Sequence, residues 1–220
     1  MTEIKKTDRT RVKRLPDRGR YDRATIDAIL DEALIAHVGF EFDGAPAVVP
    51  TACWRGGDRL YIHGSSKSRM LMALRDGARA CVCVTLMDGL VLARSAFHHS
   101  INYRSVVLYG SAVEITDPDE KIAALKDFTE KVAPGRWDEI RGPDPQEFKA
   151  TMVLAIPIAE VSAKMRSGPP IDDEPDYALP VWAGVVPLAQ SMGEPEPDPK
   201  LPPGTPVPDH ARHLDRMGRR

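Results

Sequence analysis

The sequence predicts a mainly β, antiparallel barrel with added helices, which is an α+β fold. Segments of strand length, rich in apolar residues, follow one another with turns of only two or three residues. Helical periodicity recurs in three separate places, and strands and helices do not alternate as they would in a doubly wound parallel sheet. The 220 residues, with 42% hydrophobic and 28% charged side chains, suit one globular domain with short tails.

The first element of the domain is a short amphipathic helix. Asp22 or Thr25 can cap its start, because a short polar side chain there accepts hydrogen bonds from free backbone N–H groups. One apolar helical face is indicated by residues three and four positions apart, namely Ile26, Ile29, Leu30, Ala33 and Leu34. The spacing therefore predicts a helix that ends near residue 34.

A meander of three strands follows this helix. Residues 37–42 have the composition of a strand, and the Asp-Gly pair at 43–44 is a strong hairpin signal, because both residues tolerate a positive φ. Residues 47–54 form the returning strand, and a Gly-Gly-Asp turn at 56–58 leads into residues 59–63. Such short turns predict antiparallel neighbours.

The second half of the domain adds two helices and four strands. Gly77 ends the first of these helices, and Gly110 inside a strand indicates a bulge or a close approach. Asp117 and Pro118 are the cap and the first-turn proline of the longest helix. The expected elements are a helix over 69–75, strands over 80–86 and 106–115, a helix over 117–132, and strands over 151–158 and 161–166.

Both ends of the chain differ in composition from the domain between them. Residues 1–20 hold eight Lys or Arg and three acids, whereas twelve of the 20 prolines lie after residue 168. Proline lacks an N–H and fixes φ, so a proline-rich stretch forms neither a helix nor a central strand. We therefore expect a basic, flexible arm over 1–19, one domain over 20–188 and an extended tail over 189–220.

Charge and cysteine content restrict the compartment and the partners. No basic excess continues beyond residue 20 and no aromatic side chain interrupts the basic arm, so nucleic-acid binding is not expected. No apolar run approaches the roughly 20 residues of a membrane span. Three cysteines, Cys53, Cys81 and Cys83, are an odd number, which argues against a disulfide framework. A reduced, cytoplasmic protein is expected.

The segment over residues 61–69 is the strongest candidate for a ligand site. A strand leads through Gly64 and small residues into a helix that begins near Lys67, Ser68 and Arg69. Free N–H groups at a helix start, serine hydroxyls and two cationic side chains suit a phosphate. The alternative is that serine only caps the helix while Arg69 stays solvated, and the residues alone leave both interpretations open.

Other reactive residue types have plainer interpretations. The adjacent residues His98 and His99 would point to opposite faces of a strand, so they could not both bind one metal together with His63. Cys81 and Cys83 would lie on one face of a strand, but no second cysteine pair completes a zinc site, so they fit the core. No metal site is predicted.

The order of several motifs resembles one known family. Gly-Ser-Ser-Lys-Ser-Arg at 64–69, after a Leu-Tyr-Ile-His strand, resembles the phosphate-binding segment of the pyridoxamine 5′-phosphate oxidase-like flavoproteins. The hairpin over 38–54, with its two prolines, is similar to the opening strands of that family. Residues 88–106 and 181–188 are similar to its nitroimidazole reductase-related branch. The resemblance covers about residues 20–188.

The resemblance implies a split β-barrel of the antiparallel Greek-key type, which forms a homodimer and holds one FMN per subunit at the dimer interface. By position, the backbone of 49–52 would lie along the isoalloxazine ring, 63–64 would flank the ribityl chain, and 67–69 would hold the phosphate. Later residues would reach the same flavin or that of the partner. The implied cofactor contacts are Val49, Pro50, Thr51, Ala52, His63, Gly64, Lys67, Ser68, Arg69, Asn102, Tyr103 and Trp182.

The resemblance further implies an FMN-dependent oxidoreductase, in which the flavin supplies the chemistry and the protein supplies binding and electrostatics. A nitro compound or another small electron acceptor would be the substrate, and NAD(P)H the electron donor. Two alternatives stay open: a related barrel that binds deazaflavin or haem, and a flavin-binding module without turnover. His63 is a candidate acid or substrate contact, and a place in the wall of the flavin site is the equal alternative.

Overall fold

The structure is a computed structural model that describes residues 3–212; residues 1–2 and the end of the predicted tail, 213–220, lie outside the described part. The strands are β1 (Gly19–Arg20), β2 (Ile35–Phe42), β3 (Ala45–Gly56), β4 (Arg59–Ser65), β5 (Arg79–Leu92), β6 (Ser100–Ser111), β7 (Val113–Glu114), β8 (Thr151–Pro157), β9 (Glu160–Arg166) and β10 (Gly184–Pro187). The helices are α1 (Arg23–Glu32), α2 (Arg69–Arg75), α3 (Pro118–Val132), α4 (Pro145–Ala150) and α5 (Asp209–Arg212), with short 3-10 turns η1 (Pro16–Arg18), η2 (Trp137–Glu139) and η3 (Glu174–Ala178).

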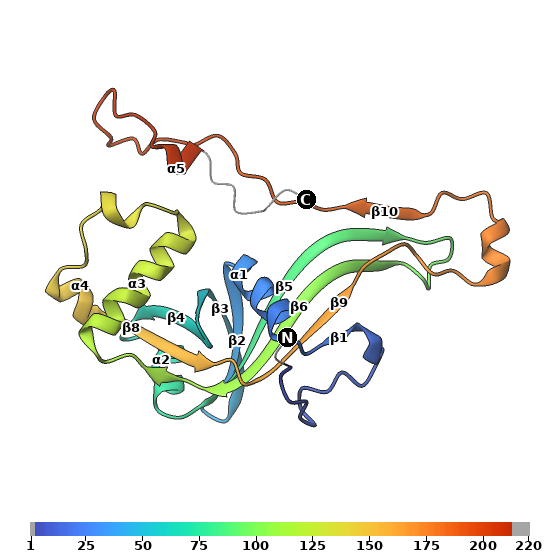
Figure 1. Ribbon diagram of the computed structural model, residues 1–220, viewed down its shortest axis with the longest axis horizontal. Helices are drawn as coiled ribbons and strands as arrows, with labels where there is room; N and C mark the ends of the chain where they lie inside the picture. The colour runs from blue at the N-terminus through green and yellow to red at the C-terminus, as the bar shows by residue number, and fades with distance from the viewer. Residues whose placement is uncertain (1–2, 213–220) are drawn as a thin grey trace.

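The described strands form one antiparallel sheet in the order β1-β9-β6-β5-β2-β3-β4-β8-β7, and β10 pairs with β5 outside this path. Figure 1 shows α3 and α4 at one end of the curved sheet and a long ribbon of β5 and β6 extending from the other end. This is the mainly β, antiparallel architecture with added helices that the sequence predicts. Within the described residues, no helix combines the length and the apolar character that a membrane crossing needs.

The β2–β3 hairpin forms as its Asp-Gly signal predicts. Asp43 and Gly44 have φ angles of 51° and 71°, the two positive values that a two-residue turn of this kind requires. The two strands then pair without a break along the whole of β2. On its other side, β3 pairs with β4 only from Cys53 onward. Residues 45–52 of β3 therefore keep one edge that no strand covers among the described residues.

The helix boundaries agree with the capping signals in the sequence. Asp22 caps α1 by accepting a hydrogen bond from Thr25 N at 2.9 Å, so the first of the two predicted caps is correct. α2 covers the predicted residues 69–75, and Gly77 follows it with a φ of 109°, a value that favours glycine at a helix end. α3 begins after Asp117, whose side chain caps it as predicted.

Two packed layers share β8. Leu154 and Ile156 point into the main core inside the sheet, whereas Val153 and Ala155 pack with Trp54 under α3. Because both faces of β8 are covered, its sequence is apolar almost throughout. The largest fully buried side chains of the main core are Ile26, Ile29, Leu30, Val38, Leu60, Ile62, Leu71, Leu74, Leu108, Leu154 and Ile156.

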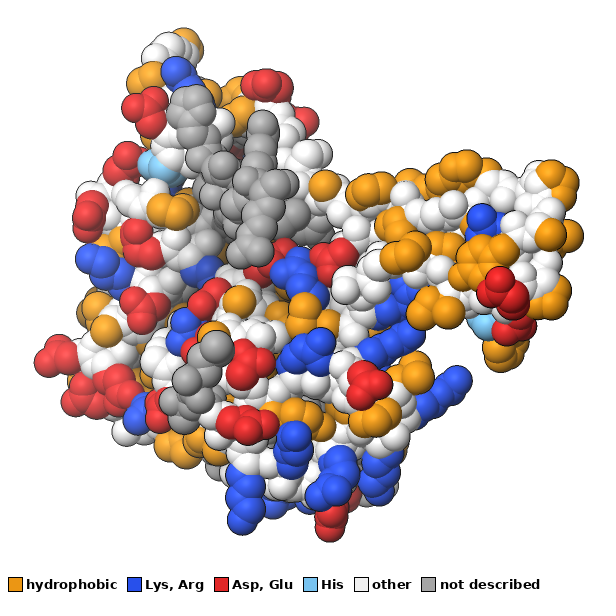
Figure 2. Space-filling model, turned by 45° about the vertical axis from the view of Figure 1, so that its right-hand side comes forward, with side chains coloured by type: hydrophobic (Ala, Val, Ile, Leu, Met, Phe, Trp, Pro, Cys, Tyr) orange, Lys and Arg blue, Asp and Glu red, His pale blue; other side chains and the backbone are white. Residues whose placement is uncertain are grey.

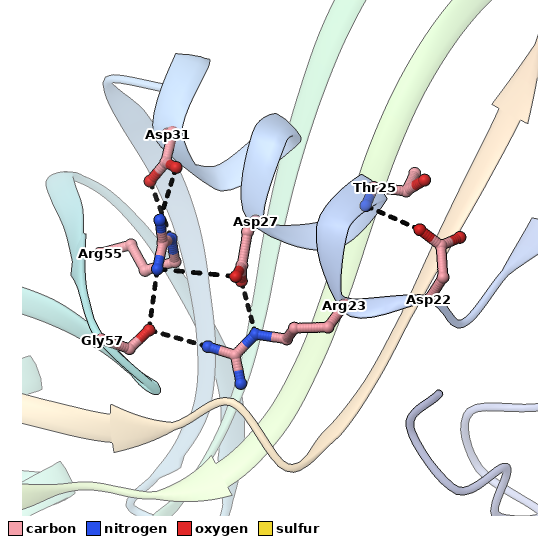
Figure 3. Close-up of polar contacts among 7 residues, drawn as sticks. All are labelled: Asp22, Arg23, Thr25, Asp27, Asp31, Arg55 and Gly57. Carbon is pink, nitrogen blue, oxygen red and sulfur yellow. Dashed lines mark hydrogen bonds and ion pairs between the residues drawn. The ribbon is translucent and has the colours of Figure 1, made fainter. Parts of the chain in front are cut away.

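Two arginines fix α1 against the turn between β3 and β4 (Figure 3). Arg55 donates to both carboxylate oxygens of Asp31, at 2.6 and 2.8 Å, and its Nη1 lies 3.6 Å from Asp27 Oδ2. Arg23 donates to Asp27 at 2.6 Å, and both guanidinium groups donate to Gly57 O, at 2.8 and 2.9 Å. This shared network sets the orientation of α1 on the sheet.

β5 and β6 are longer than the sequence predicts. β5 continues beyond the predicted end at residue 86, and β6 begins before the predicted start at 106. The prediction stopped short because Gly89 interrupts the apolar pattern, whereas in the structure it marks a register shift within a continuing ladder. We call residues 87–103 together with 169–188, which include η3 and β10, the arm; it extends from the body in Figure 1.

The turn at the end of the arm contains His98 and His99, which the sequence placed on a strand. That expectation was wrong, because this segment connects β5 to β6. His99 Nδ1 lies 2.9 Å from Ser95 O, and His98 Nε2 lies 3.3 Å from Asp173 Oδ2. The two rings therefore have separate partners within the arm.

The basic N-terminal segment lies against the body of the protein. Tyr21 Oη accepts a hydrogen bond from Val12 N at 2.8 Å and donates to Thr10 O at 3.3 Å. Thr7 Oγ1 donates to Glu160 Oε1 of β9 at 3.1 Å. The segment expected to be a flexible arm thus forms a loop that β1 closes by pairing with β9, because its threonine and tyrosine hydroxyls find partners there.

Candidate functional site

The start of α2 faces a groove beside β2 and β3. The groove has a volume of about 230 Å³ and is lined by Phe40, Phe42, Ala47, Val49, Ser68, Arg69 and Met70. Arg69 lies over the ring of Phe42, with its Cζ 5.4 Å from the ring centroid. The fold thus brings together Val49, Ser68 and Arg69, three of the predicted cofactor contacts, from two separate elements.

The loop before α2 is held by its backbone, which leaves its side chains available. Ser66 N donates to Ala150 O at 2.8 Å. Ser68 makes no side-chain capping bond, so its hydroxyl is not engaged at the helix start. Lys67 and Arg69 are exposed, and neither has an acid within ion-pair distance among the residues that the structure describes. Two cations and a hydroxyl in this position suit a phosphate.

The uncovered edge of β3 borders the same groove. Residues 49–52, predicted to lie along the flavin ring, are all on this edge, and Ala47 and Val49 line the groove itself. Pro46 and Pro50 also lie here, where a missing N–H costs no pairing with a neighbouring strand. The remaining backbone groups of the edge are available to a planar, hydrogen-bonding ligand.

The side chain of His63 points away from the groove. Leu60 and Ile62 face the main core, so strand alternation turns His63 to the opposite face, under α3. Its ring centroid lies 4.5 Å from that of Phe128 and 5.4 Å from that of Trp54. Nδ1 is buried without a hydrogen-bond partner in the described residues, and burial lowers the pKa of the imidazole. The ring is therefore uncharged at neutral pH.

Burial of His63 makes the stability of the cofactor-free protein depend on pH. Its pKa in the folded state lies below the ordinary 6.5, so between these two values only the unfolded chain binds the proton. The free energy of unfolding should therefore fall as the pH drops below about 6.5. Urea unfolding at several pH values should show that the free energy of unfolding depends less steeply on pH in His63→Phe than in the wild type. The matched variant His99→Phe, at an exposed histidine, should keep the wild-type slope, and equal slopes in all three proteins would contradict the assignment.

Asn102, Tyr103 and Trp182 lie on the arm, at a distance from the groove. Asn102 pairs with Gly89 of β5, whereas the groove-lining end of β2 stands opposite Cys81. At about 3.3 Å per residue, this separation along β5 is roughly 25 Å. Within one chain, the three arm residues and the predicted phosphate contacts therefore do not form one site.

Two arginines at the base of the arm were not predicted as site residues. Arg104 forms ion pairs with Glu32 of α1 and with Asp88 of β5. Arg166 is buried and donates to Asn102 Oδ1, and also to the carbonyl oxygen of Gly168 at 3.1 Å. Contacts between residues so far apart leave no local pattern in the sequence, so no sequence signal could have identified them.

The cysteines differ from the prediction in their placement. Cys81 and Cys83 alternate with the core residue Val82 and therefore lie half-buried on the outer face of β5. The expectation of a core position was wrong, because the alternate residues of this strand fill the core. Cys53 is buried, and burial raises the pKa of its thiol. The described part of the chain contains no group of three His, Cys, Asp or Glu that could hold a metal ion.

Comparisons with known proteins give the following matches. The family model described as pyridoxamine 5′-phosphate oxidase matches residues 22–165. No curated protein matches the chain. Among solved structures, the flavocytochrome Anf3 from Azotobacter vinelandii is 47% identical, with a TM-score of 0.88, over 93% of this chain and 95% of that chain.

Two further solved structures extend the comparison. The FAD and haem binding protein from Mycobacterium smegmatis is 41% identical, with a TM-score of 0.85, over 89% of this chain and 96% of that one. A candidate 5-nitroimidazole antibiotic resistance protein from Bacteroides thetaiotaomicron is 23% identical, with a TM-score of 0.54, over 66% of this chain and 85% of that one, and shares the fold. The predicted split-barrel fold with added helices is confirmed.

Proposed function

Because the chain belongs to the pyridoxamine 5′-phosphate oxidase family, as its motifs predicted, we propose that it is a flavin-binding redox protein. One observation supports this proposal above the others: the uncovered edge of β3 leads into the groove that holds Ser68 and Arg69. A flavin joins a planar ring with hydrogen-bonding edges to a phosphate through a flexible chain. The edge suits the ring, and the start of α2 suits the phosphate.

Each part of the groove has its own task in this proposal. Arg69 binds two phosphate oxygens through its planar guanidinium, Lys67 adds a second positive charge and the Ser68 hydroxyl donates a hydrogen bond. Backbone groups of residues 49–52 hydrogen-bond the ring and fix its orientation. The flavin supplies hydride or electron transfer when bound. FMN and FAD have the ring, the ribityl chain and the first phosphate in common, so the same residues would hold either.

A homodimer would cover the outer face of β2, β3 and β5. Val48, Gly39 and Cys81 stand in one row across these three strands, and Val48 is 65% exposed. Ile35 on the same face is 51% exposed, so this face carries exposed apolar side chains that a partner would cover. At a flavin beside such an interface, a small electron acceptor such as a nitro compound would react, with NAD(P)H as donor. The free thiols fit a reduced, cytoplasmic setting.

Haem as a second cofactor is favoured by the environment of His63 and by the names of the Azotobacter and Mycobacterium proteins. An uncharged histidine nitrogen is one of the groups that would hold a haem iron. His63 is neutral and lies among aromatic rings with one unbonded nitrogen. Val132 follows Phe128 by one helical turn and is exposed, as are Leu34 and Ile35 at the nearby start of β2. The neutral imidazole and the exposed apolar side chains near it support haem as a second cofactor.

The visible spectrum of the purified protein tests both cofactors. We expect bands of oxidised flavin and a Soret band, retained after FMN or FAD and haemin are added and the excess is removed. His63→Phe should lose the Soret band and keep the flavin bands, whereas His99→Phe should keep both. Retention of haem by His63→Phe would overturn its role as the ligand. If neither FMN nor FAD is retained, the flavin proposal is wrong and deazaflavin becomes the next compound to add.

A further inference from the structure

The charges of this chain are separated along the sequence. Residues 1–20 carry a net charge of +5, and residues 167–199 contain seven acids and no Lys or Arg. Together these two segments account for the whole net charge of −2, so the rest of the chain is balanced. The acidic segment forms one side of the arm and continues into the tail, whereas the basic segment forms the N-terminal loop.

The N-terminal loop presents cations that have no acidic partner. Arg11, Lys13 and Arg14 are exposed, and none of them lies within ion-pair distance of an acid among the described residues. The ion pairs of this loop involve Lys6 and Arg9 instead. Because Tyr21 and β9 hold the loop in place, these three charges stay together on one surface. We call residues 11–14 the basic loop.

The end of the arm presents the opposite charge on an apolar surface. Asp173 and Glu174 are exposed there, and we call residues 173–176 the acidic tip. Phe97 is 88% exposed and Ile171 is 72% exposed on the same arm. Figure 2 shows hydrophobic side chains over the arm with acidic side chains at its end, and Lys and Arg side chains gathered on the body below. A ribbon of three strands has no second layer to bury these apolar side chains.

The acidic tip and the basic loop do not meet within one chain. Among the described residues, no ion pair or hydrogen bond joins them, and the arm extends away from the N-terminal loop in Figure 1. Each surface is therefore available to a second molecule. The two surfaces are complementary in charge, and the arm adds an apolar area beside its charged end.

We propose that the arm lies on a second copy of this chain, with its acidic tip against the basic loop of that copy. In a two-fold dimer, the same contact forms twice, so each chain supplies one arm and receives one. This inference rests on the homodimer of the proposed function and names the segments that hold it together. It also brings Trp182 and Tyr103 of one chain to the body of the other. Within one chain, the arm lies about 25 Å from the groove, so these residues do not reach it.

Other partners fit the basic loop less well than a second copy. A single-stranded nucleic acid would need aromatic side chains for base stacking, and residues 5–18 contain none. The acidic tip, in contrast, supplies opposite charge on a surface of limited size. Every copy of the chain carries one acidic tip and one basic loop, so the two are present in equal number.

Charge reversal and its rescue test this contact. Sedimentation equilibrium at several NaCl concentrations gives the dimer dissociation constant of each variant, with the full chain and bound flavin. The acidic-tip variant combines Asp173→Lys, Glu174→Lys and Asp176→Lys. The basic-loop variant combines Arg11→Glu, Lys13→Glu and Arg14→Glu. A control outside the arm combines Glu194→Lys, Glu196→Lys and Asp198→Lys, which makes the same change in net charge as the acidic-tip variant.

We expect the wild-type dimer to weaken as salt rises, because salt screens opposite charges. Each reversal alone should weaken the dimer by roughly tenfold or more, and the two reversals in one chain should restore most of the affinity. The control should dimerise like the wild type. Thermal unfolding of every variant shows whether the fold is kept.

Four results would overturn the proposed contact. The first is a dimer whose affinity neither reversal changes. The second is a combined variant in which the two losses of affinity add rather than cancel. The third is a wild-type chain that stays monomeric. The fourth is a basic loop that binds duplex DNA while its charge reversal leaves the dimer dissociation constant unchanged. Failure of flavin binding is measured separately by absorbance, so a dimer that needs the arm but binds no flavin would contradict only the proposed function.

Discussion

Arg69→Ala should weaken flavin binding by roughly tenfold to a hundredfold, because it removes charge-assisted hydrogen bonds to the phosphate. The side chain is exposed at the mouth of the groove and has no acidic partner in the described residues that would have to be released first. It also lies over Phe42, which holds it beside the predicted phosphate position. Fluorescence titration of the cofactor-free protein with FMN and with FAD measures the change.

Arg75→Ala is the matched control for this variant. Arg75 is the last residue of the same helix and is ion-paired with Asp76 at 2.8 Å, outside the groove. The same deletion of one guanidinium there should leave flavin affinity within about twofold, since surface pairs contribute little. Ser68→Ala should give a smaller loss than Arg69→Ala, because a neutral donor forms a weaker bond to phosphate. Unchanged affinity in Arg69→Ala would place the phosphate elsewhere.

The parts of the fold that the sequence predicts are those with local causes. The Asp-Gly pair at 43–44 lies between two strand-forming segments and tolerates the two positive φ angles that the structure shows there, so the hairpin follows from a local signal. Asp117 caps α3 with its own side chain, and the same residues that predict α2 form it. The groove residues Ser68 and Arg69 could be found for the same reason, since they adjoin a strand, a loop and a helix start.

The parts that the sequence does not predict depend on residues far apart. Gly89 interrupts the pattern of β5, and the strand continues because it pairs there with β6 on one side and, almost a hundred residues later, with β10 on the other. Arg104 likewise finds Glu32 only when α1 lies beside the sheet. His63 is a different case. Alternation with Leu60 and Ile62 could have placed it outside the core, but nothing local shows that α3 covers that face.

Trp54→Ala should lower the free energy of unfolding of the cofactor-free protein by about 3–5 kcal/mol, since it opens a cavity at the centre of the layer under α3. Trp54 is 1% exposed. Its ring is stacked on Tyr61 at 5.6 Å between centroids and packs against Phe128 at 5.2 Å. Urea unfolding at neutral pH measures the loss, and an unchanged slope with urea confirms that the same surface is exposed.

Trp54→Phe separates the cavity from the lost aromatic contact. Phenylalanine keeps part of the volume, and it also removes the buried Nε1, which has no hydrogen-bond partner among the described residues. Its cost should therefore be clearly smaller than that of Trp54→Ala. The pKa of His63 should also differ between the two variants, because His63 packs against the Trp54 ring. If water reaches His63 in Trp54→Ala, its pKa returns toward 6.5, and the fall in stability at acidic pH becomes shallower than in Trp54→Phe. If the free energy of unfolding changes equally with pH in both variants, Phe128 alone is enough to shield His63 from water.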